Sequence, residues 1–295
     1  MNSGKPDISI VGAGVVVTAL GVLAVRAGYR VVAVASRTEA SAAKAVRVIG
    51  QGEAFFGEQA ADAAGRGELV LLTVNDDAIA DVAEQLARAK AVGAGAVVAH
   101  RSGVLGSVVL APLQRECGAA VASMHPLQTF PSVLAAVDAL AGCYFFCEGD
   151  SPAVSAVMQL AGDIGGVTVE IEADRKALYH AAACMACNYL ATLQEAAISA
   201  AVLAGIGTLP ARQALAPLVA ATVANINDLG PGPALTGPIA RGDNRTVARH
   251  LQALDAVEPE LAALYRTLGR RTVELARQAG KIDQAAATRL LQVLS

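Results

Sequence analysis

The sequence has few aromatic residues and no tryptophan. Phe, Trp and Tyr make up 3% of the 295 residues, whereas hydrophobic residues make up 54%. The apolar mass is therefore mostly Ala, Val and Leu, which suits closely packed helices and buried parallel strands. Charged residues make up only 17%, so the chain is able to bury a large core and is not a disordered protein.

The sequence also lacks a basic excess, a cysteine framework and a membrane-length apolar run. The formal net charge is -3, which argues against a nucleic-acid partner. The five cysteines show no framework spacing, which indicates free thiols in a reducing compartment. The longest apolar stretches, residues 15–25 and 196–206, are shorter than the roughly 20 residues of a membrane helix. With a polar start at residues 1–6 and no recognisable targeting segment, we expect a cytoplasmic protein without a membrane partner.

Short aliphatic and β-branched runs alternate with helical stretches in the first half of the chain. A helix over residues 15–27 ends at Gly28, and another begins at Ser151-Pro152 and ends at Gly165-Gly166. The alternation predicts βαβ units in an α/β fold, a doubly wound and mostly parallel sheet of the Rossmann type. The predicted strands are residues 8–11, 31–35, 69–74, 96–99, 120–123, 143–147 and 167–171.

The second half of the sequence has helical patterns alone. Helices are expected over residues 175–205, 210–229 and 245 to the C-terminus, the last interrupted at Gly280, with a rigid Gly- and Pro-rich loop over 230–238. The sequence therefore predicts two domains: an α/β domain over residues 1–170 and an all-helical domain over residues 171–295. Because the helix over 175–205 is too apolar to face solvent, we place it at the centre of the second domain or of a homodimer.

A glycine turn follows the first predicted strand and opens a helix. Gly12 and Gly14 allow a tight turn and a close approach of the backbone to a pyrophosphate at the helix N-terminus. The third position of this dinucleotide-binding fingerprint, normally Gly or Ala, is Val17. The sequence predicts a dinucleotide site formed by Gly12, Ala13, Gly14, Val15, Val16, Val74 and Asn75.

The end of the second strand indicates which dinucleotide binds. An NAD enzyme usually carries Asp or Glu here to hold the ribose 2′-hydroxyl, but this chain has Ser36, Arg37 and Thr38. Arg37 with two flanking hydroxyls fits a 2′-phosphate, so NADP(H) is the expected cofactor. The alternative is a solvated surface arginine. Asp76 and Asp77, after the strand over 69–74, are expected to cap the next helix.

Two polar clusters lie at the carboxyl ends of later strands. Ser102 and the Gly103 amide are able to bind a substrate carboxylate, while His100 and His125 are able to orient a substrate or donate protons. The alternative is that either histidine only bonds to backbone at a strand end. No carboxylate lies beside these histidines, and the single Cys184-x-x-Cys187 motif lies in an Ala-rich helix. We therefore expect no metal site, and we expect both thiols in the core.

A third cluster opens the helical half. Lys176 and His180 lie on one helix face, Cys187 returns to that face, and Asn188 lies at its edge. A lysine at the start of an apolar helix is either a surface group whose stem covers apolar surface or a buried amine with a lowered pKa. The buried amine would be suited to act as a general acid, and the spacing does not decide between the two.

Taken together, these motifs resemble the 6-phosphogluconate dehydrogenase-like superfamily. That group includes ketopantoate reductases, β-hydroxyacid dehydrogenases, pyrroline-5-carboxylate reductases and coenzyme F420-dependent NADP oxidoreductases. The chain is most similar to the Rossmann-like family with a C-terminal domain of unknown function, DUF2520. The segments that carry the resemblance are residues 74–80 (VNDDAIA), 100–103 (HRSG), 124–130 (MHPLQTF), 176–190 (KALYHAAACMACNYL) and 235–243 (LTGPIARGD).

The resemblance implies roles for individual residues. Lys176 matches the lysine that polarises the substrate carbonyl in ketopantoate reductases, and His180 stands where those enzymes have Asn. Thr236 resembles part of their substrate loop, although Val247 replaces its usual glutamate. The implied function is NADPH-dependent reduction of a small, ketopantoate-like 2-oxo acid. Lys176, His180 and Asn188 would be catalytic, and the substrate would contact His100, Ser102, Gly103, His125 and Thr236. The alternatives are an imine or pyrroline-5-carboxylate-type reductase and a non-catalytic nucleotide-binding protein.

Overall fold

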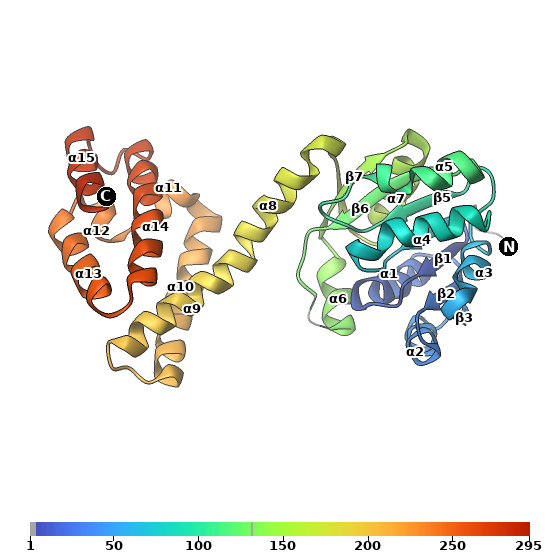
Figure 1. Cartoon of the computed structure of the whole chain (residues 1–295), viewed down its shortest axis with the longest axis horizontal. Helices are drawn as coiled ribbons and strands as arrows, with labels where there is room; N and C mark the ends of the chain where they lie inside the picture. The colour runs from blue at the N-terminus through green and yellow to red at the C-terminus, as the bar shows by residue number, and fades with distance from the viewer. Residues whose placement is uncertain (1–3, 131) are drawn as a thin grey trace. The chain divides into compact units, whose positions relative to one another are not determined.

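The computed structural model of the protein describes residues 4–130 and 132–295. The chain forms two compact units, Met1–Met185 and Ala186–Ser295 (Figure 1). The first unit is an α/β domain built on one sheet, and the second is entirely helical in its regular structure. This is the fold class that the sequence predicts.

The sheet of the first unit has the order β3-β2-β1-β4-β5-β6-β7-β8. Strands β1 to β6 run parallel to one another, β6 and β7 pair antiparallel, and β7 and β8 pair parallel. The chain leaves β1 in one direction toward β3 and returns to its other side with β4, so the switch point lies between β1 and β4. The strands are β1 (Ile8–Val11), β2 (Val31–Ser36), β3 (Glu53–Phe56), β4 (Leu69–Leu72), β5 (Val97–His100), β6 (Ala120–Pro126), β7 (Tyr144–Gly149) and β8 (Val167–Glu170).

Helices cover both faces of this sheet, and each face has its own apolar core. One core combines α1, α2, α6 and α7 with the sheet, and the other combines α3, α4 and α5 with it. Because both faces are buried, the central strands are mostly aliphatic: β4 is Leu-Val-Leu-Leu, and the equally buried β1 is aliphatic except for Ser9. The helices are α1 (Val15–Arg26), α2 (Glu39–Ile49), α3 (Ala60–Ala64), α4 (Asp76–Arg88), α5 (Ala111–Cys117), α6 (Val133–Leu140), α7 (Ser151–Asp163) and α8 (Lys176–Ala186), with single 3-10 turns η1 (Gly57–Gln59), η2 (Ser107–Leu110) and η3 (Ala173–Arg175).

The second unit consists of seven helices in the described chain. Its core lies among α12 to α15, whereas α9 and α10 each bury a single residue, Ala196 and Ala211. The bounds are α9 (Asn188–Leu203), α10 (Thr208–Leu229), α11 (Pro231–Ala234), α12 (Gly237–Ala240), α13 (Asn244–Val257), α14 (Pro259–Gln278) and α15 (Gln284–Val293).

Two of the expected helices are divided, and the expected loop is partly helical. The predicted helix over 175–205 breaks at Cys187, which separates α8 from α9. Glu258 adopts an extended conformation before Pro259 and divides α13 from α14, because a residue that precedes proline avoids the helical region. The expected rigid loop over 230–238 instead holds the short helices α11 and α12.

The division between the units falls inside the predicted central helix. The change in composition near residue 170 suggests a boundary there, but α8 begins at Lys176, whose side chain is buried against the sheet of the first unit. The first turns of α8 therefore belong to the α/β unit.

The antiparallel pair β6–β7 depends on a glycine, which gives a test of the fold. Gly149 has φ +136°, and a Cβ added there would lie 2.3 Å from the Val121 carbonyl oxygen. We expect Gly149→Ala to cost about 3 kcal/mol of unfolding free energy from backbone strain and overpacking. Gly142→Ala, at φ +78° with nothing within 4 Å, is the control and should cost about 1 kcal/mol. Urea unfolding measures both variants, and equal losses would contradict the predicted clash.

Candidate functional site

A cleft of about 400 Å³ lies at the carboxyl edge of the sheet, around the switch point. Open α/β sheets bind ligands at this position. Of the residues that the sequence predicts for the cofactor, seven line the cleft: Gly12, Ala13, Gly14, Ser36, Arg37, Val74 and Asn75. Thr73, Ser41 and Arg101 also line it and were not predicted for the cofactor.

The turn between β1 and α1 needs its first glycine. Gly12 has φ +113°, and an added Cβ would lie 2.7 Å from the backbone carbon of Thr73. The Thr73 hydroxyl donates to the Gly12 carbonyl over 2.9 Å and holds the turn against β4. Gly14 caps α1 without a side-chain hydrogen bond, and a Cβ there would meet nothing within 4 Å. The turn therefore leaves the amides at the start of α1 open to an anion.

Val17 does not obstruct this turn. Its side chain is buried in the core between α1 and the sheet. The close contact of α1 lies one turn later, at Gly21, and is made with α2: a Cβ added at Gly21 would lie 2.7 Å from Cδ1 of Ile49. Val15 and Val16 follow in the first turn of α1, and neither lines the cleft.

The end of β2 supplies the cationic side of the cleft. Arg37 is exposed, lines the cleft beside Ser36 and Ser41, and has no ion-pair partner among the described residues. Thr38 has a different place: its hydroxyl accepts from the Ser41 amide over 3.3 Å and caps α2. An unpaired guanidinium next to two serine hydroxyls suits a phosphate group.

The loop after β5 holds a neutral histidine. The Ser102 amide donates to Nδ1 of His100 over 3.1 Å, so the proton is on Nε2, 3.2 Å from the Gly106 carbonyl. Burial, and next the charge of Lys176, lower the pKa of His100 to about 4. Both ring nitrogens of the buried His100 thus bond to backbone, which is the structural alternative given above for this histidine.

Ser102 also has its hydrogen-bonding capacity filled by the protein. Its hydroxyl donates to the Asp76 carboxylate over 2.7 Å and accepts from the amides of Val104 and Leu105. The Ser102 hydroxyl is thus engaged by the protein, and binding of a substrate carboxylate at Ser102 and the Gly103 amide stays a prediction. Asp76 is likewise not a helix cap: Asn75 precedes α4 as its N-cap, and neither Asn75 nor Asp76 makes a side-chain cap there.

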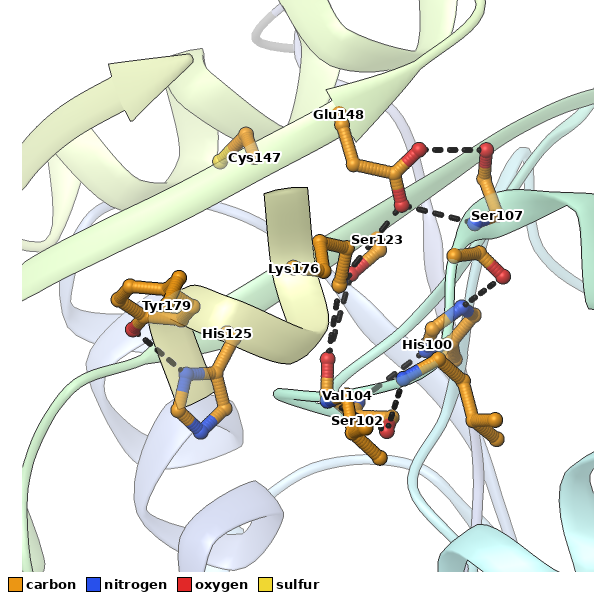
Figure 2. Close-up of polar contacts among 12 residues, drawn as sticks. His100, Ser102, Val104, Ser107, Ser123, His125, Cys147, Glu148, Lys176 and Tyr179 are labelled. Atoms are coloured by element: carbon orange, nitrogen blue, oxygen red, sulfur yellow. Dashed lines mark hydrogen bonds and ion pairs between the residues drawn. The ribbon is translucent and has the colours of Figure 1, made fainter. Parts of the chain in front are cut away.

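The antiparallel pairing of β6 with β7 builds a polar face for α8. Ser123 lies opposite Glu148, and His125 lies opposite Phe146, so these four side chains share one face of the sheet. Lys176, at the start of α8, contacts the first pair, and Tyr179, one turn later, contacts the second. Figure 2 shows both helix residues pointing at these strands.

Lys176 is enclosed by this face. The side chain is 1% exposed, and Nζ donates to the Ser102 carbonyl over 3.0 Å and to the Ser123 hydroxyl. Oε1 of Glu148 lies 3.6 Å from Nζ, and both side chains are buried. Burial lowers the pKa of Lys176, and the Glu148 carboxylate opposes this shift. Of the two alternatives for Lys176, the structure shows the buried amine.

His125 stands next to His180 and Tyr179. The Tyr179 hydroxyl lies 2.8 Å from Nδ1 of His125 (Figure 2). The rings of His125 and His180 meet edge to face, with 5.7 Å between the ring centroids. Burial and the neighbouring His180 lower the pKa of His125 to about 4. Gly103 packs against both rings, since a Cβ there would lie 2.3 Å from His180. Nε2 of His125 has no hydrogen-bond partner in the described part of the chain.

Two residues of this site were missed from the sequence. Tyr179 lies one turn from Lys176 on the same predicted helix, and this spacing was the available signal. Glu148 follows an apolar strand and gives no signal of its own, because its partner Lys176 lies beyond β8.

Asn188 and Thr236 lie in the second unit. Asn188 is exposed at the start of α9, and Thr236 lines an apolar cavity of about 330 Å³ among α9, α12, α13 and α14. Cys187 is exposed and Cys184 half-buried, so the expectation that both thiols are in the core is wrong. The structure shows no cluster of three or more His, Cys, Asp or Glu side chains suited to a metal within residues 4–130 and 132–295. None of the helices in that part combines the length and hydropathy needed to cross a bilayer.

The fold is shared with solved structures. A candidate NADP oxidoreductase of Bacteroides fragilis is 24% identical, with a TM-score of 0.71 over 92% of this chain and 98% of the other. A protein of Thermotoga maritima is 25% identical, with a TM-score of 0.72 over 93% and 98%. An imine reductase of Myxococcus stipitatus, solved with NADP+, is 18% identical, with a TM-score of 0.60 over 97% and 99%.

The family comparison covers both halves of the chain. Residues 1–126 match the family described as a Rossmann-like domain, and residues 143–272 match the domain of unknown function DUF2520. No curated protein matches the sequence significantly. The chain therefore carries a Rossmann-like domain followed by a DUF2520 domain.

Proposed function

We propose that this protein is an NADP(H)-dependent oxidoreductase that reduces the C=N bond of a small imine. The observation that carries the proposal is the cleft in which the Gly12–Gly14 turn and the unpaired Arg37 lie together. A candidate NADP oxidoreductase and an imine reductase with bound NADP+ share the fold, which supports the same proposal.

The residues of the cleft fit NADP(H) in two places. The amides at the start of α1, left open by Gly14, would bind the pyrophosphate. Arg37, with Ser36 and Ser41, would bind the 2′-phosphate. When bound, the cofactor supplies the hydride. Arg101 also lines the cleft and would contact the cofactor at the end of the site nearest β5. The neighbouring strand β6 carries His125.

The enclosed Lys176 favours an imine over a 2-oxo acid. Reduction of a carbonyl creates an alkoxide that needs a proton donor, whereas an iminium already carries its proton when the hydride arrives. The Lys176 ammonium is buried, with its hydrogen bonds made to the protein. This arrangement gives no support to a ketopantoate-like substrate, and neither do the names of the similar structures.

The substrate side of the proposal depends on His125 and His180. The free Nε2 of His125 and the adjoining His180 ring lie at the end of β6, where they would orient a polar group of the substrate. Asn188 and Thr236 stay predictions for the same role.

A substrate panel tests the proposed activity directly. We expect NADPH absorbance at 340 nm to fall with five- or six-membered cyclic imines and to stay constant with 2-oxo acids, ketopantoate included. Gly12→Val, which would place side-chain atoms against Thr73, should abolish NADPH binding and activity together. Turnover of a 2-oxo acid alone would reverse the substrate assignment. Tight NADPH binding with no turnover of any compound would indicate a nucleotide-binding protein.

The choice of NADP(H) over NAD(H) is tested at Arg37. Arg37→Asp should raise the NADPH dissociation constant about 10- to 100-fold, because it removes charge-assisted hydrogen bonds to the 2′-phosphate. The NADH dissociation constant should change less than about threefold. Arg47→Asp makes the same charge change on exposed α2 surface outside the cleft and should leave both constants unchanged. Fluorescence titration measures both dissociation constants for the wild type and the two variants, and equal weakening of NADPH and NADH binding by Arg37→Asp would contradict the role of Arg37.

We further propose a homodimer formed through α9 and α10. These helices bury one residue each but leave many large apolar side chains in solvent, more than a monomer usually exposes in one region. A second copy of the same two helices would bring an equally apolar surface against this one, so that both would be removed from water. The exposed side chains are Leu190, Leu193, Val202, Leu203, Leu209, Leu218, Val223, Ile226 and Leu229.

Light scattering tests the homodimer. The wild-type protein should have the mass of two chains, and Leu218→Glu, at a side chain that is 62% exposed, should reduce it to one by placing charge in the interface. Leu291→Glu on α15, at a side chain that is 41% exposed, is the control and should leave the mass unchanged. A wild-type monomer at every concentration would exclude the homodimer.

A further inference from the structure

We propose that Lys176 and Glu148 form a positioning pair that fixes the loop of residues 101–107, and that Lys176 does not donate the proton to the substrate. The activity readout of the test rests on the proposed reductase function, while the structural readouts stand without it. The inference assigns a role to Glu148 and gives Lys176 a role other than the one its resemblance to ketopantoate reductases implies.

The hydrogen bonds of the Lys176 ammonium are all directed into the protein. An ammonium has three N–H donors, and the oxygens around Nζ are the Ser102 carbonyl, the Ser123 hydroxyl and Oε1 of Glu148. Two of these contacts are hydrogen bonds, and the third is an ion pair at 3.6 Å. Because Lys176 is 1% exposed, its ammonium does not face solvent or an open substrate site. To reach one, Lys176 would have to give up these contacts and leave a buried carboxylate without its counter-charge.

Glu148 connects β7 to the far end of the loop. Its carboxylate accepts the Ser107 amide over 2.7 Å and the Ser107 hydroxyl over 2.8 Å (Figure 2). Glu148 is 4% exposed, so these two bonds and the charge of Lys176 replace the water that it loses. The carboxylate therefore fixes the start of η2 and the ammonium at the same time.

The pair forms hydrogen bonds with the loop at two positions. Lys176 binds it at the Ser102 carbonyl, and Glu148 binds it at Ser107. Gly103, between these points, packs against the rings of His125 and His180, and Arg101, directly before them, lines the cofactor cleft. A shift of this loop would therefore move both the cleft wall and the contact surface of the two histidines.

Neighbouring groups would keep the hydrogen bonds of the loop if both charges, Lys176 and Glu148, were removed together. The Ser123 hydroxyl already donates to the Ser102 carbonyl over 3.4 Å, so this carbonyl keeps a hydrogen-bond partner when the lysine is absent. A glutamine at 148 keeps the shape of the side chain and an oxygen for the Ser107 amide. In Lys176→Met/Glu148→Gln the buried charges are both gone and the hydrogen bonds of the loop are still satisfied.

The double-variant experiment compares Lys176→Met, Glu148→Gln and their combination. Each single change leaves one buried charge without its partner and should lower the melting temperature by roughly 10 °C. Lys176→Met should also weaken NADPH binding, because the loop with Arg101 loosens. The double variant should return to within about 3 °C of the wild type and recover the NADPH dissociation constant.

Turnover separates a positioning lysine from a proton donor. The double variant should recover kcat for the imine to within about tenfold of the wild type. If Lys176 is the proton donor, the double variant will regain its melting temperature and NADPH binding and still lose kcat by at least about 100-fold, which would overturn the proposal. Melting temperatures of the double variant no higher than those of the single variants would overturn the pair itself.

A measurement on the wild-type protein needs neither folding of a variant nor a substrate. Competitive acetylation read by mass spectrometry should modify Lys176 much more slowly than the exposed Lys44, Lys90 and Lys281. Labelling of Lys176 as fast as these, with protection by NADPH, would show an accessible amine and contradict the positioning role. If no imine is turned over, the reductase proposal fails, while the labelling and melting results still decide the role of the pair.

Discussion

A buried ammonium needs a carboxylate and oxygen acceptors in place of water, and this requirement organises the centre of the first unit. The acceptors of Lys176 come from β6, from β7 and from the loop after β5. The antiparallel pairing of β6 with β7 makes this possible, because it sets Ser123 directly opposite Glu148 on the face that α8 covers. The same register sets His125 opposite Phe146, so Tyr179, one helical turn beyond Lys176, reaches both. One ion pair thus fixes the direction in which α8 leaves the sheet and the place of the aromatic and imidazole rings beside it.

The cofactor cleft and the polar face of α8 meet in a single loop. The backbone determines the shape of the cleft. Gly12 has a positive φ and packs against Thr73, and α1 begins at Gly14 without a side-chain cap. The polar face owes its shape to side chains. Between them, Arg101 lines the cleft while its neighbour Ser102 gives its carbonyl to Lys176 and its hydroxyl to Asp76 at the start of α4. The loop after β5 is therefore tied to α4 and to α8, and any ligand that contacts Arg101 acts on a segment that is held from both sides.

The sequence predicted the parts of the structure that depend on local pattern. Buried aliphatic runs gave β1 and β4, and the glycine turn gave the cleft wall, because each carries its signal within a few residues. It missed β3 at the edge of the sheet, whose apolar run is only three residues long and is mostly accessible. It missed the end of α13, although Pro259 marks it. Glu148 was beyond the reach of sequence reasoning, because a carboxylate at the end of a strand becomes a buried partner only through the pairing of β6 with β7. Ser102 was placed correctly at the strand end, but the hydrogen bonds that occupy its hydroxyl come from residues 76, 104 and 105.

The surroundings of Lys176 show how a matching residue is able to take a different role. A lysine at the start of the helix after a nucleotide-binding domain is free to act on a substrate only where its amine faces an open site. Here the strand register supplies a carboxylate and a serine hydroxyl beneath it, and the ammonium is drawn into the protein. An apolar pair of the same volume would pack as well, but it would not direct the Ser102 carbonyl or the Ser107 amide, and buried ionic groups are retained in some proteins for such specificity at little gain in stability. We infer that the chain keeps these two charges for the geometry of the loop. One turn beyond Lys176 on α8, Tyr179 and His180 lie beside His125 of β6, so the loop that the two charges hold packs against the side chains that we propose for substrate binding.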